Sequence, residues 1–221
     1  AGLIGGVALA AFVGLGVFIY INTNVWNDYR SQDAEQARLA AYEKALLPFE
    51  NTPQPAIVDV RLALDLHPHA PSLKTVGRYV VVNDTDTPQT EIHLRWQPEL
   101  EVTRLDVEGA RLAREWKEFD YRIYRFDTPL QPGERRTVRF ETRLAQRGFK
   151  VRGNTTRIVD NGTFVTNGEF APIIGMGRDS LLTDRTQRRK RGLPAELRMA
   201  KLEDTTAQAS NYIDADWVSA D

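Results

Sequence analysis

The first 21 residues of this 221-residue chain, residues 1–21, form an unbroken apolar run that contains no charged residue. At about 1.5 Å of rise per residue, a helix of this length spans about 31 Å, close to the hydrocarbon thickness of a bilayer. No basic residue precedes the run, and it is longer than the apolar core of a signal peptide. The sequence therefore predicts a transmembrane helix over 1–27, in preference to a signal peptide or a buried core helix. Because the chain begins with Ala1 and not Met, we expect it to be the last helix of a larger membrane domain.

Small residues recur at every fourth position of the predicted helix, at Gly2, Gly6, Ala10 and Gly14. Such a stripe lets a neighbouring transmembrane helix approach closely, so these four residues are predicted to pack against other helices. The alternative is that small residues are simply common in apolar helices. Tyr20, Trp26 and Tyr29 follow where an aromatic belt meets the lipid headgroups. The flank beyond them has no excess of Lys or Arg, which favours an extracytoplasmic location for the soluble part.

The rest of the chain has an ordinary globular composition, since 27% of all residues are charged and 42% are hydrophobic. A net charge of −1 argues against nucleic acid as the main partner. The sequence contains no cysteine, which excludes disulfide bonds and thiolate chemistry.

From residue 56 the hydrophobic pattern has the period of two that is typical of half-buried strands. A juxtamembrane helix over 28–50, capped by Ser31, and a Pro-containing linker precede it. Strands are predicted over 56–66, 76–82, 92–96, 100–107, 121–126 and 138–144. Pro132–Gly133 is typical of a type II turn. Short helices are expected over 179–191, closed by Gly192, and over 194–202.

These elements predict a mainly β fold, an antiparallel sandwich or saddle with an N-terminal transmembrane helix, a juxtamembrane helix and short C-terminal helices. The predicted division of the chain is a transmembrane helix over 1–27, a juxtamembrane helix and linker over 28–52, a β-saddle domain over 53–150, and a saddle end with a helical extension over 151–221.

The sequence predicts neither a catalytic residue nor a metal site in this segment. His67 and His69 would share a face of a strand, but they flank Pro68 in a predicted turn, so exposed turn histidines are favoured over metal ligands. The third histidine, His93, has no carboxylate partner that the sequence indicates. There is no H-E-x-x-H, glycine-rich phosphate loop or G-x-S-x-G. A basic run over 185–191 could bind lipid or nucleic acid, but a solvated helix face or salt bridges to an acidic neighbour are favoured.

The strand sequences 58–66 (VDVRLALDL), 76–82 (VGRYVVV) and 92–96 (IHLRW) resemble the opening strands of the aminopeptidase N-like (gluzincin) family. The later segments 121–126 (YRIYRF), 129–133 (PLQPG) and 137–140 (TVRF) fit its later saddle strands. The segments 161–164 (NGTF), 169–175 (EFAPIIG), 188–194 (RRKRGLP) and 215–217 (ADW) are similar to a bacterial branch. In that branch an ABC-transporter permease is fused to an extracytoplasmic aminopeptidase-like part.

The resemblance implies a place in the bacterial inner membrane, with the soluble part on the periplasmic side. The family's H-E-x-x-H helix lies downstream of the saddle, so zinc is expected in a downstream domain and no cofactor in this segment. The implied partners are membrane lipid, other transmembrane helices, an ATP-binding subunit of an ABC transporter and a peptide substrate, but not nucleic acid.

The resemblance also implies a substrate-binding role for Asn167 and Glu169. Thr166-Asn-Gly-Glu169 is similar to a Thr-Gln-x-Glu stretch that contacts the amino-terminal part of the substrate in the family. Glu169 would offer an anion to the substrate's ammonium group and Asn167 an amide. The alternative is that Asn167–Gly168 is simply a turn. For the whole chain, the expected function is a non-catalytic, membrane-anchored domain that tethers a peptidase part and lines its cleft. The alternative is a non-enzymatic periplasmic module that binds a partner or gates a transporter.

Overall fold

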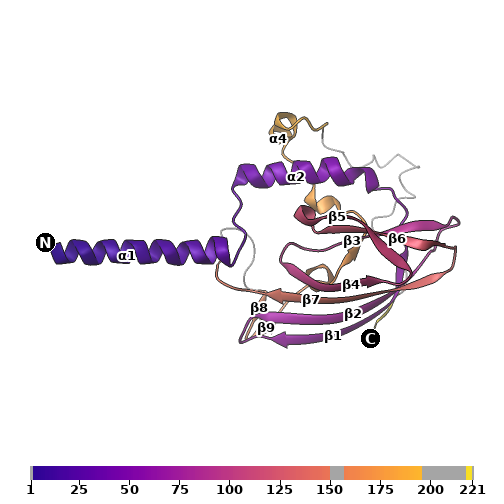
Figure 1. The fold of residues 1–221 in the computed structure, drawn as a ribbon, viewed down its shortest axis with the longest axis horizontal. Coiled ribbons are helices and arrows are strands. Elements are labelled where there is room, and N and C mark those ends of the chain that lie inside the picture. The colour runs from indigo at the N-terminus through magenta and orange to yellow at the C-terminus, as the bar shows by residue number, and fades with distance from the viewer. Residues whose placement is uncertain (1, 150–156, 196–217, 221) are drawn as a thin grey trace.

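The N-terminal helix α1 (Gly2–Tyr20) extends away from the rest of the molecule in this computed structural model (Figure 1). The structure describes residues 2–149, 157–195 and 218–220. A π-helical turn, Ile21–Val25, continues α1, and the segment Gly2–Val25 is long and apolar enough to cross a membrane. None of the side chains of α1 is buried. Within the described residues, the apolar run is therefore not a core helix.

The second helix, α2 (Gln32–Leu46), is shorter than the predicted 28–50. Ser31 caps it as predicted, because its hydroxyl accepts a hydrogen bond from the Ala34 N–H at 3.3 Å. The chain enters this cap in an extended conformation, so the residues before Ser31 do not join the helix. A 3-10 turn, Leu47–Phe49, follows α2, and Pro48 in this turn lacks the N–H that an α-helix would need to continue.

Two sheets form the body of the molecule beneath α2 (Figure 1). The strands of the five-stranded sheet lie in the order β11 (Ser219–Ala220), β1 (Ala56–His67), β2 (Ser72–Val82), β7 (Arg135–Ala145) and β4 (Leu100–Val107). Those of the four-stranded sheet lie in the order β10 (Ile173–Ile174), β3 (Gln89–Arg95), β6 (Tyr121–Leu130) and β5 (Ala110–Trp116). All neighbours are antiparallel except β11, which is parallel to β1. The predicted mainly β sandwich or saddle is confirmed.

The strand predictions missed β5, several two-residue strands and the irregularities within the strands. β5 was not predicted, because its residues are largely exposed and a register shift between Leu112 and Arg114 interrupts their alternation. β1 has a register shift between Ile57 and Asp59, so Ile57 and not Val58 packs against the core. The predicted turn at Pro132–Gly133 is present, with Gly133 at a φ of +74°.

The main core lies between the two sheets, and a second cluster lies under α2. β6 serves both, because alternate side chains of a strand point to opposite faces. Tyr124 and Phe126 of β6 belong to the main core. The second cluster contains Tyr42, Leu46, Phe119, Tyr121 and Ile123. The described chain after α1 therefore has three layers, in which α2 covers the outer face of the four-stranded sheet.

The C-terminal part of the described chain contains a hairpin of two short strands, β8 (Ile158–Val159) and β9 (Gly162–Thr163), and short helices. These are α3 (Asn167–Phe170), a 3-10 turn (Arg178–Ser180) and α4 (Arg185–Lys190). Only part of the predicted helix 179–191 is thus helical. Gly192 ends it at a φ of +68°, as predicted. The second predicted helix, 194–202, falls mostly outside the described residues.

A buried ion pair joins α4 to α2. The Arg188 guanidinium contacts both carboxylate oxygens of Glu43, at 2.6 and 2.7 Å, and the two side chains are only 3% and 2% exposed. Arg188 also donates to the carbonyl oxygens of Leu182 and Pro194. Each guanidinium nitrogen therefore has a partner, and these contacts hold residues 182–194 against α2.

This pair predicts a large loss of stability when either partner is removed alone. Arg188→Met or Glu43→Gln leaves a buried charge without its partner, so each should lower the free energy of unfolding by about 3–5 kcal/mol. The double variant Glu43→Leu/Arg188→Met should recover most of that loss. Arg111→Met, which breaks an exposed pair with Asp127, is the control and should cost at most about 1 kcal/mol. Denaturant unfolding of the full chain in detergent, followed by tryptophan fluorescence, measures these values; equal effects of Arg188→Met and Arg111→Met would contradict the prediction.

Candidate functional site

The predicted substrate-binding residues lie in the single-turn helix α3. Thr166 and Glu169 form a capping box, in which the Thr166 N–H donates to the Glu169 carboxylate at 2.7 Å. Asn167 is exposed as the first residue of α3. Asn167 and Gly168 therefore belong to a helical turn.

The core of the sandwich holds this turn in place. The Thr142 hydroxyl of β7 donates to the Phe170 carbonyl at 2.5 Å, and the Tyr79 hydroxyl of β2 donates to the Pro172 carbonyl at 3.1 Å. Phe170 and Ala171 are themselves part of the main core. The position of α3 is thus fixed by buried contacts on its C-terminal side.

Glu169 uses both of its oxygens within the protein. One accepts the capping hydrogen bond, and the other lies 3.0 Å from the Arg157 guanidinium. A substrate ammonium group would therefore meet a carboxylate that is already oriented and partly neutralised. The role of Asn167 and Glu169 in substrate binding stays a prediction.

The small-residue stripe of α1 faces open space. A Cβ atom added at Gly2, Gly6 or Gly14 would meet no atom within 4 Å, and Ala10 is exposed on the same helix. A neighbouring helix thus has room to approach this face closely. Packing of the stripe against another transmembrane helix stays a prediction.

His67, the last residue of β1, and His69, in the turn after it, are both exposed and have different acidic partners. His67 lies 3.1 Å from Asp65, whereas His69 lies 3.0 Å from Asp160 in the β8–β9 hairpin. Over residues 2–149, 157–195 and 218–220, no three His, Cys, Asp or Glu side chains are grouped so that they could hold a metal ion.

His93 is buried in a hydrogen-bonded chain that the sequence did not indicate. Its Nε2 lies 2.9 Å from a Glu91 oxygen, and its Nδ1 lies 2.7 Å from the Tyr121 hydroxyl. The expectation that His93 has no carboxylate partner was wrong, because residues two apart in a strand share a face.

Phe49 packs edge-on against the His93 imidazole and helps to bury it. Burial lowers the pKa of His93, although Glu91 partly opposes this, and burial raises the pKa of Tyr121. The side chains of Glu91, His93 and Tyr121 all have hydrogen-bond partners, and His93 is inaccessible to solvent. We therefore interpret this arrangement as structural.

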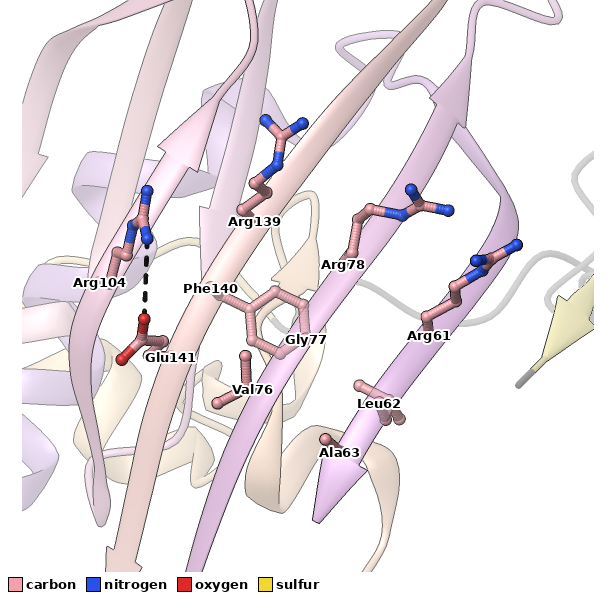
Figure 2. A pocket seen from close by; sticks show the side chains of 10 residues that line it. All are labelled: Arg61, Leu62, Ala63, Val76, Gly77, Arg78, Arg104, Arg139, Phe140 and Glu141. Atoms are coloured by element: carbon pink, nitrogen blue, oxygen red, sulfur yellow. Dashed lines mark ion pairs between the residues drawn. The ribbon is translucent and has the colours of Figure 1, made fainter.

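A groove of about 480 Å³ lies on the five-stranded sheet and is lined by four arginines from four neighbouring strands (Figure 2). They are Arg61 of β1, Arg78 of β2, Arg139 of β7 and Arg104 of β4. Arg78 is the direct cross-strand neighbour of both Arg61 and Arg139, and like charges in such positions repel.

Acidic side chains beside the groove compensate part of this repulsion. Asp59 lies 3.2 Å from Arg78 and 3.7 Å from Arg61, while Glu141 lies 3.7 Å from Arg104. A hydrogen bond from the Ser219 hydroxyl, together with Arg78, lowers the pKa of Asp59 and keeps it charged. The groove therefore presents a basic rim to solvent, which suits a carboxylate or another anionic group. In the sequence, single arginines stand between less polar residues in 60–62 (VRL), 77–79 (GRY) and 138–140 (VRF), but their alignment across strands is not indicated.

The basic run over 185–191 is largely occupied by contacts within the protein. Arg188 pairs with Glu43, and Lys190 and Arg191 lie 3.2 and 2.9 Å from Asp33. These are the salt bridges to an acidic neighbour that the sequence analysis favoured for this run. Arg185 and Arg189 are exposed on α4.

No known protein family and no curated protein matches this sequence. Among solved structures, the M1 zinc metallopeptidase from Deinococcus radiodurans is similar over 48% of this chain and 23% of its own, with 18% identity and a TM-score of 0.35. A two-domain M1 zinc metallopeptidase bound to L-tryptophan gives 18% identity and a TM-score of 0.35 over 44% and 22% of the two chains. Leukotriene A4 hydrolase from Saccharomyces cerevisiae is similar over 42% of this chain and 15% of its own, with 13% identity and a TM-score of 0.30. This chain thus spans less than a quarter of the length of each structure, and none of the three is named as a transporter.

The buried His93 predicts that stability falls in mild acid. The pKa of His93 is lower in the folded protein than the value of about 6.5 in the unfolded chain, so the unfolded chain takes up the proton first as the pH falls. The neutral His93 therefore makes its full contribution to the free energy of unfolding above pH 6.5, and this contribution is lost progressively below that pH. We expect His93→Gln to flatten this part of the pH profile of the unfolding midpoint, whereas His69→Gln, at an exposed turn, should leave it unchanged. An identical profile for His93→Gln and the unaltered chain would contradict the prediction.

Proposed function

We propose that this chain is the membrane-anchored, non-catalytic β domain of a bacterial protein in which an ABC-transporter permease is fused to a zinc aminopeptidase-like part. In this proposal α1 lies in the inner membrane and the sandwich lies on the periplasmic side. The domain tethers the peptidase part close to the transporter, which raises its effective concentration there. It also forms one wall of the peptidase's substrate cleft.

The observation that carries the proposal is the exposure of α1, in which no side chain is buried. An apolar helix that is long enough to span a bilayer, and that the described chain contacts only near its end at Phe18, requires an apolar environment. Lipid and neighbouring transmembrane helices both supply one, and the small-residue stripe suits the second. The family resemblance of the 161–194 motifs supports the peptidase assignment.

Two features of α3 support its place beside a substrate. Asn167 is exposed as the first residue of α3, and Glu169 supplies a carboxylate in a turn that core hydrogen bonds hold in place. A carboxylate that is held rigidly loses little conformational entropy when it binds an ammonium group.

An assay of the complete protein tests this function. We expect bound zinc and hydrolysis of peptides with a free amino terminus. Glu169→Gln should raise KM for such peptides by about tenfold, the equivalent of about 1.4 kcal/mol of lost binding, with a smaller effect on kcat. The matched control is Glu141→Gln on the outer face of the five-stranded sheet, which should leave KM unchanged. Active enzyme whose KM does not respond to Glu169→Gln would contradict the cleft-lining role, and a complete protein without an H-E-x-x-H segment or zinc would contradict the peptidase assignment.

A second function, that of a non-enzymatic module which binds a partner or gates the transporter, is favoured by the arginine groove. Arg61, Arg78 and Arg139 face solvent side by side on a sheet face, where they suit an acidic segment of another protein. A complete protein that is inactive and free of zinc would favour this alternative.

A further inference from the structure

The loop that follows β7, residues 146–149, packs against the end of α1. The Asn27 side-chain amide donates to the Arg147 carbonyl at 2.9 Å. The Phe149 ring lies beside the Phe18 ring of α1, with 6.0 Å between the ring centroids. The loop therefore contacts the helix at two levels, one after the π-helical turn and one within α1 itself.

Gly148 makes this close approach possible. It adopts a φ of +61°, and a Cβ atom at this position would lie 2.7 Å from the Asn22 side-chain oxygen. Although α1 is exposed along its length, Asn22 is only 3% exposed. Its amide donates to the Phe18 carbonyl at 2.7 Å. The loop thus covers a polar side chain near the end of an apolar helix, where contact with lipid would be costly.

The depth of this contact follows from where the apolar run ends. Its first polar side chains are Asn22, Thr23 and Asn24, and Tyr20 and Trp26 flank them as interfacial aromatic residues. Phe18 precedes Asn22 by four positions, or about 6 Å along the axis. In a helix that spans the membrane, Phe18 therefore lies on the lipid side of the boundary, and Phe149 contacts it there.

The chemistry of the loop suits this position. The Phe149 side chain is 40% exposed beside an apolar helix, and Tyr20, Trp26 and Tyr29, near the end of the same helix in sequence, are also exposed aromatic residues. Arg147, exposed next to Gly148, offers a cation to lipid phosphates. The Gln146 N–H donates to the Pro71 carbonyl at 2.8 Å, which ties the loop to the β1–β2 turn. The loop is thus held by the sandwich as well as by the helix.

We propose that loop 146–149 is a second membrane contact, in which Phe149 inserts at the boundary between headgroups and acyl chains and Arg147 binds lipid phosphate. This inference rests on the proposed membrane span of α1 and extends it. Two contacts at separate points, unlike a single helix, fix the tilt of the sandwich relative to the bilayer. The arginine groove and α3 would then keep a set orientation above the membrane.

Site-directed spin labelling tests the proposal, because the chain has no native cysteine. Single variants Phe149→Cys, Arg147→Cys, Leu112→Cys and Val13→Cys are labelled in the full chain and reconstituted into vesicles of phosphatidylcholine and phosphatidylglycerol. Collision rates with oxygen, which concentrates in lipid, and with a water-soluble nickel chelate are then compared. Leu112 on β5 is the matched control, since it is an apolar side chain of similar exposure, 48%, away from α1.

We expect the ratio of oxygen to nickel collisions to be several-fold higher at 149 than at 112, with 147 between them and 13 highest. A ratio at 149 equal to that at 112, with 13 still in lipid, would overturn the membrane contact and leave the span of α1 intact. A ratio at 13 equal to that at 112 would overturn the span itself. The variants at 147 and 149 are measured separately and serve as controls for each other. If one substitution distorts the loop, the label at the other position still reports its native location.

Discussion

An apolar helix that the described protein leaves uncovered is the constraint on which the whole account depends. The side chains from Leu3 to Ile19 have no protein partner in the described structure except at the last turns, where Phe18 meets Phe149. Burying this surface is worth roughly 25 cal/mol per Å², so water is a poor surrounding for it. Once α1 is placed in lipid, its junction with the sandwich decides how every other element is oriented. Asn22, Asn27 and Gly148 form that junction.

The outer faces of the two sheets differ in what covers them. α2 closes the outer face of the four-stranded sheet, and the buried Arg188–Glu43 pair attaches the C-terminal segment to it. Among residues 2–149, 157–195 and 218–220, the outer face of the five-stranded sheet is open, which leaves the arginine groove accessible. Gly77 in the middle of β2 shows how tightly the core behind that groove is filled, because a Cβ there would lie 2.1 Å from the Phe140 ring.

Features that depend on residues close in sequence could be predicted. The apolar run, the Ser31 cap, the Pro132–Gly133 turn and the Gly192 helix end each follow from a local preference, and the structure has all four. The alternating strands also predicted the mainly β class. These signals are local because one turn or one strand face contains all of the information.

Features that depend on register or on distant partners could not be predicted. The bulge at Val58 changes which side chains of β1 face the core, and nothing in the alternation indicates it. Glu91 was overlooked as the partner of His93, although a strand places them on one face. The cross-strand row of Arg61, Arg78 and Arg139 exists only because three strands pair in one register. Glu169 was predicted as a substrate anion, but its contact with Arg157 requires the folded chain.

Extraction of the chain from cell membranes tests the central claim most directly. If α1 spans the bilayer, the chain should stay in the membrane pellet after washes with alkaline carbonate and with high salt, and only detergent should release it. A chain that carbonate moves to the supernatant as folded, monodisperse protein would contradict a transmembrane α1, and with it the proposed orientation of the sandwich above the membrane.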